Sequence, residues 1–236
     1  GMIVAGGSFT SFTPNAATTA TTRNYLARIK TDGTVDTFDP SASGAVSVLA
    51  AYSDGKIIVG GAFNAFSPNS IGNTNFRNYI ARLNADGTVD SNFDPNTNGP
   101  VNAVAVELNG AVVFGGTFTA LQPNGAIEAI ARNRLARVDF SGALDTTFQP
   151  LLNGQVSTLA LQADGKVVIG GAFTAVWGQG ATSVNRGFVA RFRPDGALDG
   201  AFAPTLNGAV NAVAQQADGK LVIGGGFTRA TPPGAS

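Results

Sequence analysis

Side chains able to perform chemistry are few in this sequence. The 236 residues contain no histidine and no cysteine, which removes the commonest general base, the thiolate nucleophile and the usual zinc ligands. Two glutamates, Glu107 and Glu128, and a set of repeated aspartates are the available carboxylates. Glu107 falls at a strand end beside a turn, and Glu128 falls in a loop without a counterpart. We interpret both as solvated surface residues and expect no enzymatic activity.

Calcium binding is the second chemistry that the residue types allow. The segment NADGTVD, from Asn84 to Asp90, spaces oxygen-bearing side chains like the start of an EF-hand loop. The first-ligand position is Lys30, Asn84, Asp139 and Arg193 in successive copies of this segment. Two cationic side chains cannot coordinate a cation, whereas a hairpin turn explains all four copies. We therefore expect no metal and no cofactor.

The overall charge and the short apolar runs argue against nucleic-acid and membrane partners. Fifteen Lys and Arg balance fifteen Asp and Glu, so no net field attracts nucleic-acid phosphates or anionic membrane surfaces. Apolar runs such as KVVIGGAF are far shorter than the roughly 20 residues of a membrane-spanning helix. We expect neither a nucleic-acid partner nor membrane insertion. Gly1 before Met2 has the form of a cloning remnant, which leaves a secretory leader, and hence the localisation, open.

A repeat along the whole chain sets the positions of these residues. IVAGGSF, ending at Phe9, recurs as IIVGGAF, VVFGGTF, VVIGGAF and LVIGGGF, ending at Phe63, Phe118, Phe173 and Phe227. The steps are 54, 55, 55 and 54 residues. The series RNYLAR, RNYIAR, RNRLAR and RGFVAR keeps the same phase, as does DGTVD, DGTVD, SGALD and DGALD before a Phe-x-Pro motif. The chain is therefore four copies of one unit.

Each unit is expected to hold four short antiparallel strands in two hairpins. In one copy, residues 101–107 and 111–118 flank the turn 108–110, and RNRLARVD and ALDTTF flank residues 140–142. A three-residue loop fits these turns: a type I turn followed by a glycine with positive φ that makes a bulge. The corresponding second-hairpin turns elsewhere are Thr31-Asp32-Gly33, Ala85-Asp86-Gly87 and Pro194-Asp195-Gly196.

This turn type predicts which residues face each other across the second hairpin. Pairing Lys30 with Thr34 places Arg28 opposite Asp36. The equivalent pairs are Arg82 with Asp90, Arg137 with Asp145, and Arg191 with Asp199. Because cross-strand ion pairs contribute about 0.2 to 1 kcal/mol each, we interpret the four pairs as structural.

Four-stranded units repeated around an axis are the plan of a β-propeller, in which packing buries both faces of each blade. The GG after three large apolar residues suits the close approach of neighbouring sheets. The strand that follows each Phe-x-Pro carries small alanines, which suit a crowded inner edge. A β-solenoid, the alternative, usually has shorter coils without two hairpins. We expect an all-β propeller of about four blades per chain, a single repeat domain at residues 1–228 and a flexible tail at 229–236.

The consensus G-x-V-x-A-x-A-x-x-x-DGK-x-x-x-GG-x-FT, followed by RN-x-x-AR-x-x-x-DG-x-x-D-x-x-F-x-P, resembles the delta-60 repeat family of bacterial β-propellers across nearly all of residues 3–228. The double glycine is similar, more weakly, to kelch repeats. The resemblance implies a bacterial, often secreted or surface-attached protein, without established enzymatic activity or catalytic residues to transfer. The sequence departs from the family pattern in longer loops between GG-x-FT and RN, and at Asn109, Ser141 and Arg186-Gly187.

The inserted loops are the best candidates for a binding site, because all four leave the same hairpin and should emerge on one face. The candidate residues are Asn15, Asn69 and Asn124, each after a proline, with Gln179 in register and Trp177 nearby. Amide side chains suit polar ligands such as glycans, and the indole offers a stacking surface. Turn formation by the Pro-Asn pairs and packing of Trp177 on its own blade are the structural alternatives.

Two function classes follow from these patterns. One is a binding module whose loop face holds a protein or a glycan, and the other is a structural spacer in a larger bacterial surface protein. Residues 3–9 and 221–227 are the same strand of the unit, so one turn of four units carries a duplicate strand. We expect a homodimer that completes an eight-bladed ring in preference to a self-closed monomer.

Overall fold

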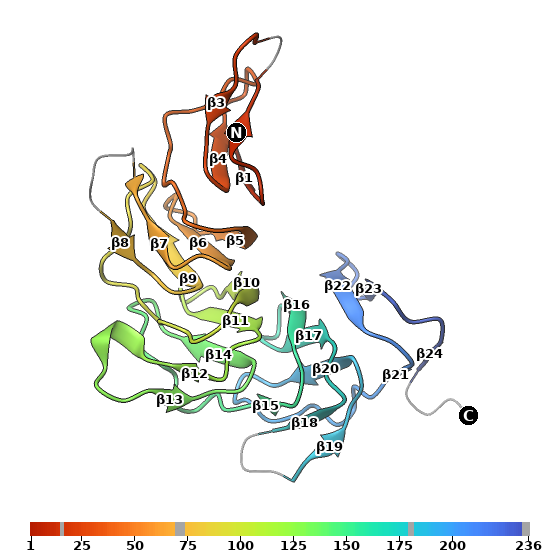
Figure 1. The fold of residues 1–236 in the computed structure, drawn as a ribbon. Helices are drawn as coiled ribbons and strands as arrows, with labels where there is room; N and C mark the ends of the chain where they lie inside the picture. Colours follow the sequence, from red (N-terminus) through yellow and green to blue (C-terminus); the bar gives the residue numbers. More distant parts are fainter. Residues whose placement is uncertain (15–16, 69–73, 179–181, 233–236) are drawn as a thin grey trace.

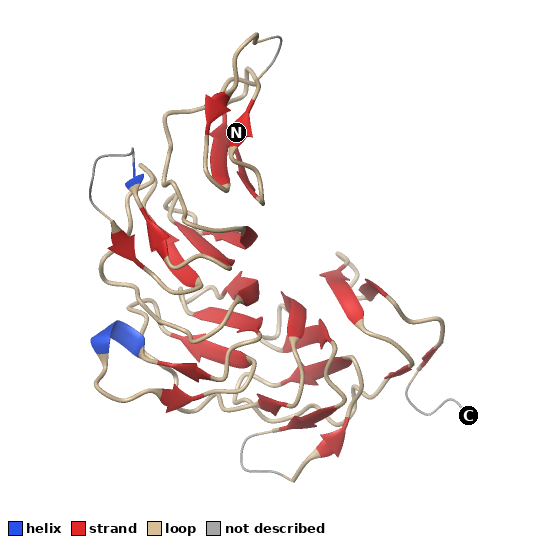
Figure 2. Ribbon diagram, viewed as in Figure 1, coloured by secondary structure: helices blue, strands red, loops and turns tan. Residues whose placement is uncertain are grey.

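The computed structural model describes residues 1–14, 17–68, 74–178 and 182–232, and strands dominate its regular structure (Figure 2). Five main antiparallel sheets follow one another along an open arc (Figure 1), and we call them blades 1 to 5 in chain order. A short 3-10 helix, Pro123–Gly125, lies in one of the inserted loops. The expected all-β class is confirmed.

Blades 2, 3 and 4 each pair an inner, a middle and an outer strand in that order. The inner strands, β5 (Val46–Ala51), β10 (Val101–Val106), β16 (Val156–Leu161) and β22 (Val210–Gln215), line the inner side of the arc (Figure 1). The middle strands are β1 (Ile3–Gly6), β6 (Ile57–Gly61), β11 (Val112–Gly116), β17 (Val167–Gly171) and β23 (Leu221–Gly225). The outer strands are β4 (Leu26–Ile29), β9 (Ile80–Leu83), β14 (Leu135–Val138) and β20 (Val189–Phe192).

In blades 1 to 4, the first glycine of the GG pair receives a valine from the next blade. A β-carbon placed on Gly60 would lie only 2.8 Å from Cγ1 of Val101, the first residue of inner strand β10. A larger residue at Gly60 would therefore force the two sheets apart. The same contact, at 2.5 Å, joins Gly6 to Val46, Gly115 to Val156, and Gly170 to Val210. The close approach expected from the GG motif is confirmed.

The hydrophobic core lies at these contacts between consecutive blades. Ile58 and Ile80 of blade 2 belong to one buried cluster with Val101, Phe114 and Phe118 of blade 3. All five side chains are at most 1% exposed. Blades 2 to 4 thus bury their sheet faces against neighbouring blades, which makes the stability of one blade depend on the next.

The fourth strand expected in each unit is reduced to a single bridge. After the hairpin turn Val89 pairs with Leu83, and the Asp90 N–H donates to the Arg82 carbonyl at 2.9 Å. The Asp90 carboxylate then accepts the N–H of Asn92 at 3.0 Å. This side-chain-capped turn directs the chain away from the sheet, so the ladder ends there. The equivalent bridges are Ile29–Val35, Val138–Leu144 and Phe192–Leu198.

The inserted loops begin and end in short strands that form small sheets of their own. In the third unit, Asn98 Oδ1 accepts the backbone N–H groups of Thr119 and Ala120 at 2.8 and 3.0 Å, which fixes the chain where it leaves the middle strand. The small sheets pair β2 (Ser11–Phe12) with β3 (Thr21–Thr22), β7 (Ala65–Phe66) with β8 (Asn75–Phe76), β12 (Ala120–Leu121) with β13 (Ile130–Ala131), and β18 (Ala175–Trp177) with β15 (Leu151–Leu152) and β19 (Val184–Asn185).

Strand pairing extends into the segment 229–236 that was expected to be a flexible tail. Strand β24 (Ala230–Thr231) pairs with β21 (Thr205–Leu206). The Oδ1 atom of Asn207 accepts the N–H groups of Thr228 and Arg229, both at 2.9 Å, so the same amide contact as in the third unit directs this segment back to the sheet.

The end blades are partial in the described part of the chain. Blade 1 consists of β1 and β4 and blade 5 of β22 and β23, and the two lie apart at opposite ends of the arc (Figure 1). Strands β1 and β23 are both middle strands, as the duplicated segment predicted. Blade 1 therefore has no inner strand, and blade 5 has no outer strand, among the described residues.

Candidate functional site

The hairpin register brings each repeated arginine onto its aspartate. In blade 2, Arg82 Nε donates to Asp90 Oδ2 at 2.9 Å. The closest nitrogen–oxygen distances in the equivalent pairs are 2.6 Å for Arg28–Asp36, 2.7 Å for Arg137–Asp145 and 2.9 Å for Arg191–Asp199. Because Asp90 also caps the turn that ends the sheet, one carboxylate links the strand, the turn and the guanidinium.

Each of these guanidinium groups also stacks on the phenylalanine of the Phe-x-Pro motif. Arg82 lies 4.7 Å from the ring centre of Phe93. The matching distances are 4.6 Å for Arg28 over Phe38, 4.6 Å for Arg137 over Phe148 and 4.7 Å for Arg191 over Phe202. A cation over an aromatic face is stabilised by the ring quadrupole, most strongly when water is excluded. The sequence analysis did not predict this contact, although the arginine and the Phe-x-Pro phenylalanine recur at a nearly constant separation in every unit.

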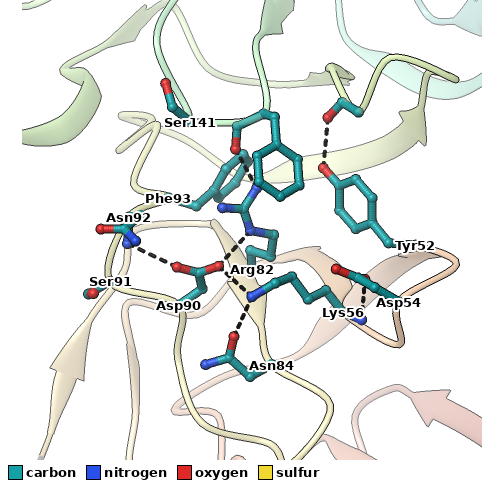
Figure 3. Close-up of polar contacts among 12 residues, drawn as sticks. Tyr52, Asp54, Lys56, Arg82, Asn84, Asp90, Ser91, Asn92, Phe93 and Ser141 are labelled. Carbon is teal, nitrogen blue, oxygen red and sulfur yellow. Dashed lines mark hydrogen bonds and ion pairs between the residues drawn. The ribbon is translucent and has the colours of Figure 1, made fainter.

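Arg82 is the most enclosed of the four arginines and joins two blades (Figure 3). Arg82 is 1% exposed. Its guanidinium carbon lies 4.3 Å from the ring centre of Phe140, which belongs to blade 3. Its Nη1 donates to the backbone carbonyl of Phe140. The hydroxyl of Tyr52 crosses the same boundary and donates to the Gly110 carbonyl at 3.0 Å. These contacts hold blades 2 and 3 together beneath a polar surface.

A lysine ammonium occupies the position considered for calcium. Lys56 Nζ donates to Asn84 Oδ1 at 2.6 Å and to Asp90 Oδ2 at 2.9 Å (Figure 3). Asp86 accepts the backbone N–H and the hydroxyl of Thr88 within its own turn, at 2.9 and 2.7 Å. These oxygens therefore already have donors. Within the described residues, no three carboxylates lie close enough together to hold a metal ion.

The pKa values of two neighbouring aspartates are shifted in opposite directions, although burial raises both. Burial, the largest influence, raises the pKa of Asp90, but hydrogen bonds from Lys56, the Asn92 N–H and Arg82 outweigh it and hold that pKa below its usual range. Burial also raises the pKa of Asp94, and there the attraction of Arg77 does not compensate. The Arg77 Nη1 and Asp94 Oδ2 atoms are 3.7 Å apart. The buried Oδ1 of Asp94 has no hydrogen-bond partner.

These side chains line a groove between blades 2 and 3, which we call the inter-blade groove. Its volume is about 1000 Å³. Lys56, Arg77, Asn84 and Asn92 line it from blade 2, and Asn124, Phe140 and Ser141 line it from blade 3. The Phe140 side chain is 46% exposed, so an aromatic surface lies among amide, hydroxyl and charged groups. Such a lining can hydrogen-bond and stack a polar ligand.

Of the five residues predicted to bind ligand, the structure places Asn124 at the inter-blade groove. Its backbone N–H donates to the Asp94 carbonyl at 2.7 Å, its Oδ1 accepts the Asp94 N–H at 3.2 Å, and its Nδ2 donates to the Ser141 carbonyl at 3.1 Å. The amide thus connects the inserted loop to the groove walls, and the turn has a positive φ of 51° at Asn124. This matches the structural alternative of turn formation.

The remaining predicted ligand-binding residues do not join Asn124. Trp177 is half-buried in strand β18 and faces Leu151 across the small sheet, which agrees with packing within its own unit. Asn15, Asn69 and Gln179 lie outside the described residues. The groove residues Lys56, Asn84 and Asn92 were not predicted as a site, because each belongs to a turn or strand end that the repeat alone explains.

The two isolated glutamates lie away from the groove. Glu107 forms an ion pair with Arg137 at 3.4 Å, and Glu128 is exposed in an inserted loop. Across the described segments, no helix has the length and apolar character needed to cross a membrane.

Sequence comparison places these features in a known family. The family described as "Domain of unknown function (DUF5122) beta-propeller" matches residues 1–38, 53–93, 162–202 and 216–234, more than half of the chain. The chain belongs to this family. The two complete matched segments run from the first hairpin turn to the Phe-x-Pro phenylalanine of a unit. The third copy of this segment is unmatched, and there Asn109 and Ser141 replace aspartates.

Solved structures agree with the propeller fold of this DUF5122 chain. The WD40 β-propeller domain of Doa1 is similar with a TM-score of 0.59 at 14% identity, over 94% of this chain. A protein of unknown function from Bacteroides caccae is similar with a TM-score of 0.53 at 12% identity, over 98% of this chain and 72% of its own. The chain spans 57% of the Doa1 structure's length. No curated protein matches the sequence. The β-propeller fold is confirmed.

Proposed function

We propose that this propeller is a non-catalytic binding module and that the inter-blade groove holds a polar ligand, with carbohydrate as the best-fitting class. The observation that carries the proposal is the combination of amide groups with an exposed aromatic ring in one groove of about 1000 Å³. Amides donate and accept hydrogen bonds, as a polyhydroxylated ligand requires. The ring of Phe140 offers the apolar face on which a sugar ring stacks.

The charges in the groove support a neutral ligand. Arg82 and Lys56 share the carboxylate of Asp90, and Arg77 faces Asp94. The three cations and two carboxylates leave one net positive charge, but each cation lies within 3.7 Å of a carboxylate, which weakens its attraction for an anionic ligand and favours a neutral polar one. Because Asp90 is held ionised by two cations, it is a poor proton donor, which supports binding without catalysis.

A structural spacer in a larger bacterial surface protein is the second candidate function. The contacts of Asn124 favour it, because its amide connects loop and groove wall instead of pointing free into the groove. The delta-60 resemblance supports a bacterial, extracellular or surface location for either function. The open arc supports the further proposal that two copies complete an eight-bladed ring.

A glycan array with the intact chain tests the binding proposal. We expect selective binding of a neutral glycan, lost or weakened at least tenfold in Asn92→Ala and Phe140→Ala. Gln216→Ala, an exposed amide in the turn between β22 and β23, is the matched control and should leave binding unchanged. Melting temperatures of all variants separate loss of binding from loss of fold. Binding that is absent, or insensitive to both groove substitutions, rejects the groove as the ligand site.

A further inference from the structure

The repeat places a groove with a different set of charges between blades 3 and 4. In blade 2, Lys56, Asn84 and Asp90 line the inter-blade groove. A cavity of about 510 Å³ occupies the equivalent place one blade further along the chain, and we call it the second groove. Its residues at the three equivalent positions are Ala111, Asp139 and Asp145. The second groove therefore lacks the lysine and gains a carboxylate.

The oxygen atoms that hold an ammonium group in blade 2 have counterparts in blade 3. Lys56 Nζ lies 2.6 Å from Asn84 Oδ1 and 2.9 Å from Asp90 Oδ2 (Figure 3). Asp145 Oδ2 accepts the arginine Nε of its own hairpin at 2.8 Å, as Asp90 Oδ2 does at 2.9 Å. Asp139 Oδ1 caps its own turn, and in the described part of the chain no donor bonds to Asp139 Oδ2. The acceptors are thus present in blade 3, whereas the residue at the donor position is an alanine.

The second groove is also the more negative of the two. Glu107, Asp139 and Asp145 are the carboxylates of its lining, and Arg137 is its cation. Arg132, outside the lining, also attracts Asp145. Three carboxylates against these two arginines leave one net negative charge, whereas the inter-blade groove carries one net positive charge. The second groove therefore favours a cationic ligand.

An apolar cavity adjoins the second groove. Its volume is about 490 Å³, and it shares Glu107 and Asn109 with the second groove. Val106 and Leu108 line it from blade 3, and Leu161 lines it from blade 4. The Leu108 side chain is fully exposed. Carboxylates and apolar side chains thus lie next to each other, which suits an ammonium carried by an aliphatic chain.

We propose that the second groove binds an aliphatic primary ammonium group. Its nitrogen takes the place between Asp139 and Asp145 that Lys56 Nζ has in blade 2, and its carbon chain lies on Leu108 and Leu161. The three N–H donors of an ammonium can reach oxygens on separate residues. A metal ion fits less well, because within the described residues no three carboxylates lie close enough together to hold one.

Two sources carry such a group: the lysine side chain of a partner protein and a free alkyl amine. The second groove lies at a different blade boundary from the inter-blade groove. Failure of the carbohydrate proposal therefore leaves this one standing, and the reverse also holds.

The melting temperature of the intact chain, measured against the concentration of n-butylammonium chloride, tests the proposal. We expect a saturable rise, and about threefold weaker binding of ethylammonium because its chain is shorter. Tetramethylammonium has the same charge without an N–H donor, and it should give no saturable rise at the same ionic strength. A rise of equal size with tetramethylammonium or with calcium chloride rejects an ammonium site. A peptide with one lysine distinguishes the sources, because tighter binding of the peptide than of butylammonium assigns the group to a partner protein.

Two variants connect the binding to the second groove. Ala111→Lys restores the lysine of blade 2, so it should fill the site and weaken butylammonium binding about tenfold or more. Asp139→Asn restores the amide of blade 2 and should weaken binding about fivefold. It changes little in size and decides the question if Ala111→Lys fails to fold. Glu128→Gln removes a carboxylate from an exposed loop and is the matched control. Binding that persists in both groove variants, or falls equally in Glu128→Gln, rejects the second groove as the ammonium site.

Discussion

Ser43 and Asn64 exchange the roles that Asn98 and Thr119 have in the next unit. The Ser43 hydroxyl accepts the N–H groups of Asn64 and Ala65, both at 3.0 Å, and donates to Asn64 Oδ1 at 2.8 Å. In the next unit the amide is on the other side, where Asn98 accepts the backbone groups and its Nδ2 donates to the Thr119 hydroxyl at 2.9 Å. The start of the inserted loop is thus held in the same way in both units, whichever of the two positions carries the amide and whichever carries the hydroxyl.

We predict that this exchange is energetically coupled. Ser43→Asn and Asn64→Thr should each destabilise the protein by about 1 kcal/mol, because each leaves polar groups poorly paired. The double variant recreates the arrangement of Asn98 and Thr119 and should recover most of that loss. Urea denaturation of the four proteins gives the coupling energy. Additive losses in the double variant would show that the two side chains act independently.

Removing Arg82 is expected to be far more damaging than removing Arg28. Arg82→Ala leaves Asp90 without its closest arginine partner at a nearly closed site and should cost about 3 to 5 kcal/mol. The Arg28 side chain is 20% exposed, so Arg28→Ala should cost about 1 kcal/mol. Thermal unfolding of both variants checks the difference. Equal losses would mean that the stacking on Phe140 and the carbonyl contact add little at blade 2.

Acid should destabilise the protein through the capped aspartates. Asp36, Asp90 and Asp145 have pKa values below the usual range because hydrogen bonds to their carboxylates outweigh the effect of burial. Their stabilisation is fully present above the pKa of unfolded aspartate, near 3.9, and is lost as the pH falls through the lower folded values. Asp90→Asn should lower the melting temperature at pH 7 and flatten its decline below pH 4. If the melting temperature of the variant fell below pH 4 as steeply as that of the wild type, groups other than Asp90 would cause the acid destabilisation.

Substitution by valine should change the unfolding free energy differently at two equivalent glycines, Gly170 and Gly224. Gly170→Val meets Val210 at 2.5 Å and Thr158 at 2.8 Å, so overpacking should cost about 1 to 3 kcal/mol. Gly224→Val meets nothing within 4 Å and should leave the unfolding free energy of the dilute monomer nearly unchanged. Chemical denaturation at low concentration compares the two. A large loss at Gly224 would indicate that the open face of blade 5 is already in use.

The repeat predicted the contacts that lie close together in the sequence. The hairpin register follows from turn composition, so the pairing of Arg28 with Asp36 needs only eight residues of chain. The contact of Arg82 with Phe140 joins residues 58 positions apart in different blades, and the periodicity does not specify the facing side chains. The apolar pattern predicted a full fourth strand. It did not show that the Asp90 carboxylate caps a turn and ends this strand early.

The candidate site was predictable only in part for the same reason. Pro-Asn in a loop indicated Asn124, and the structure places this residue at a groove. The rest of the groove comes from Lys56, Asn84 and Asn92, whose local role in turns and strand ends is sufficient to explain them in the sequence. Their convergence depends on how blade 3 packs against blade 2, which no single unit encodes.

The arginines give the arc an uneven resistance to opening. Arg28 Nη1 donates to the Ala85 carbonyl of blade 2 at 2.6 Å, and Arg82 reaches the turn of blade 3. Arg137 and Arg191 instead bond to Glu107 and Gln162 within their own blades. Polar contacts therefore reinforce the boundaries between blades 1, 2 and 3, whereas apolar packing, including Val113 of blade 3 and Val156 of blade 4, holds the boundary between blades 3 and 4. The arc should therefore part under force in a defined order, and the mostly exposed strand β23 should exchange its amides before the buried middle strands.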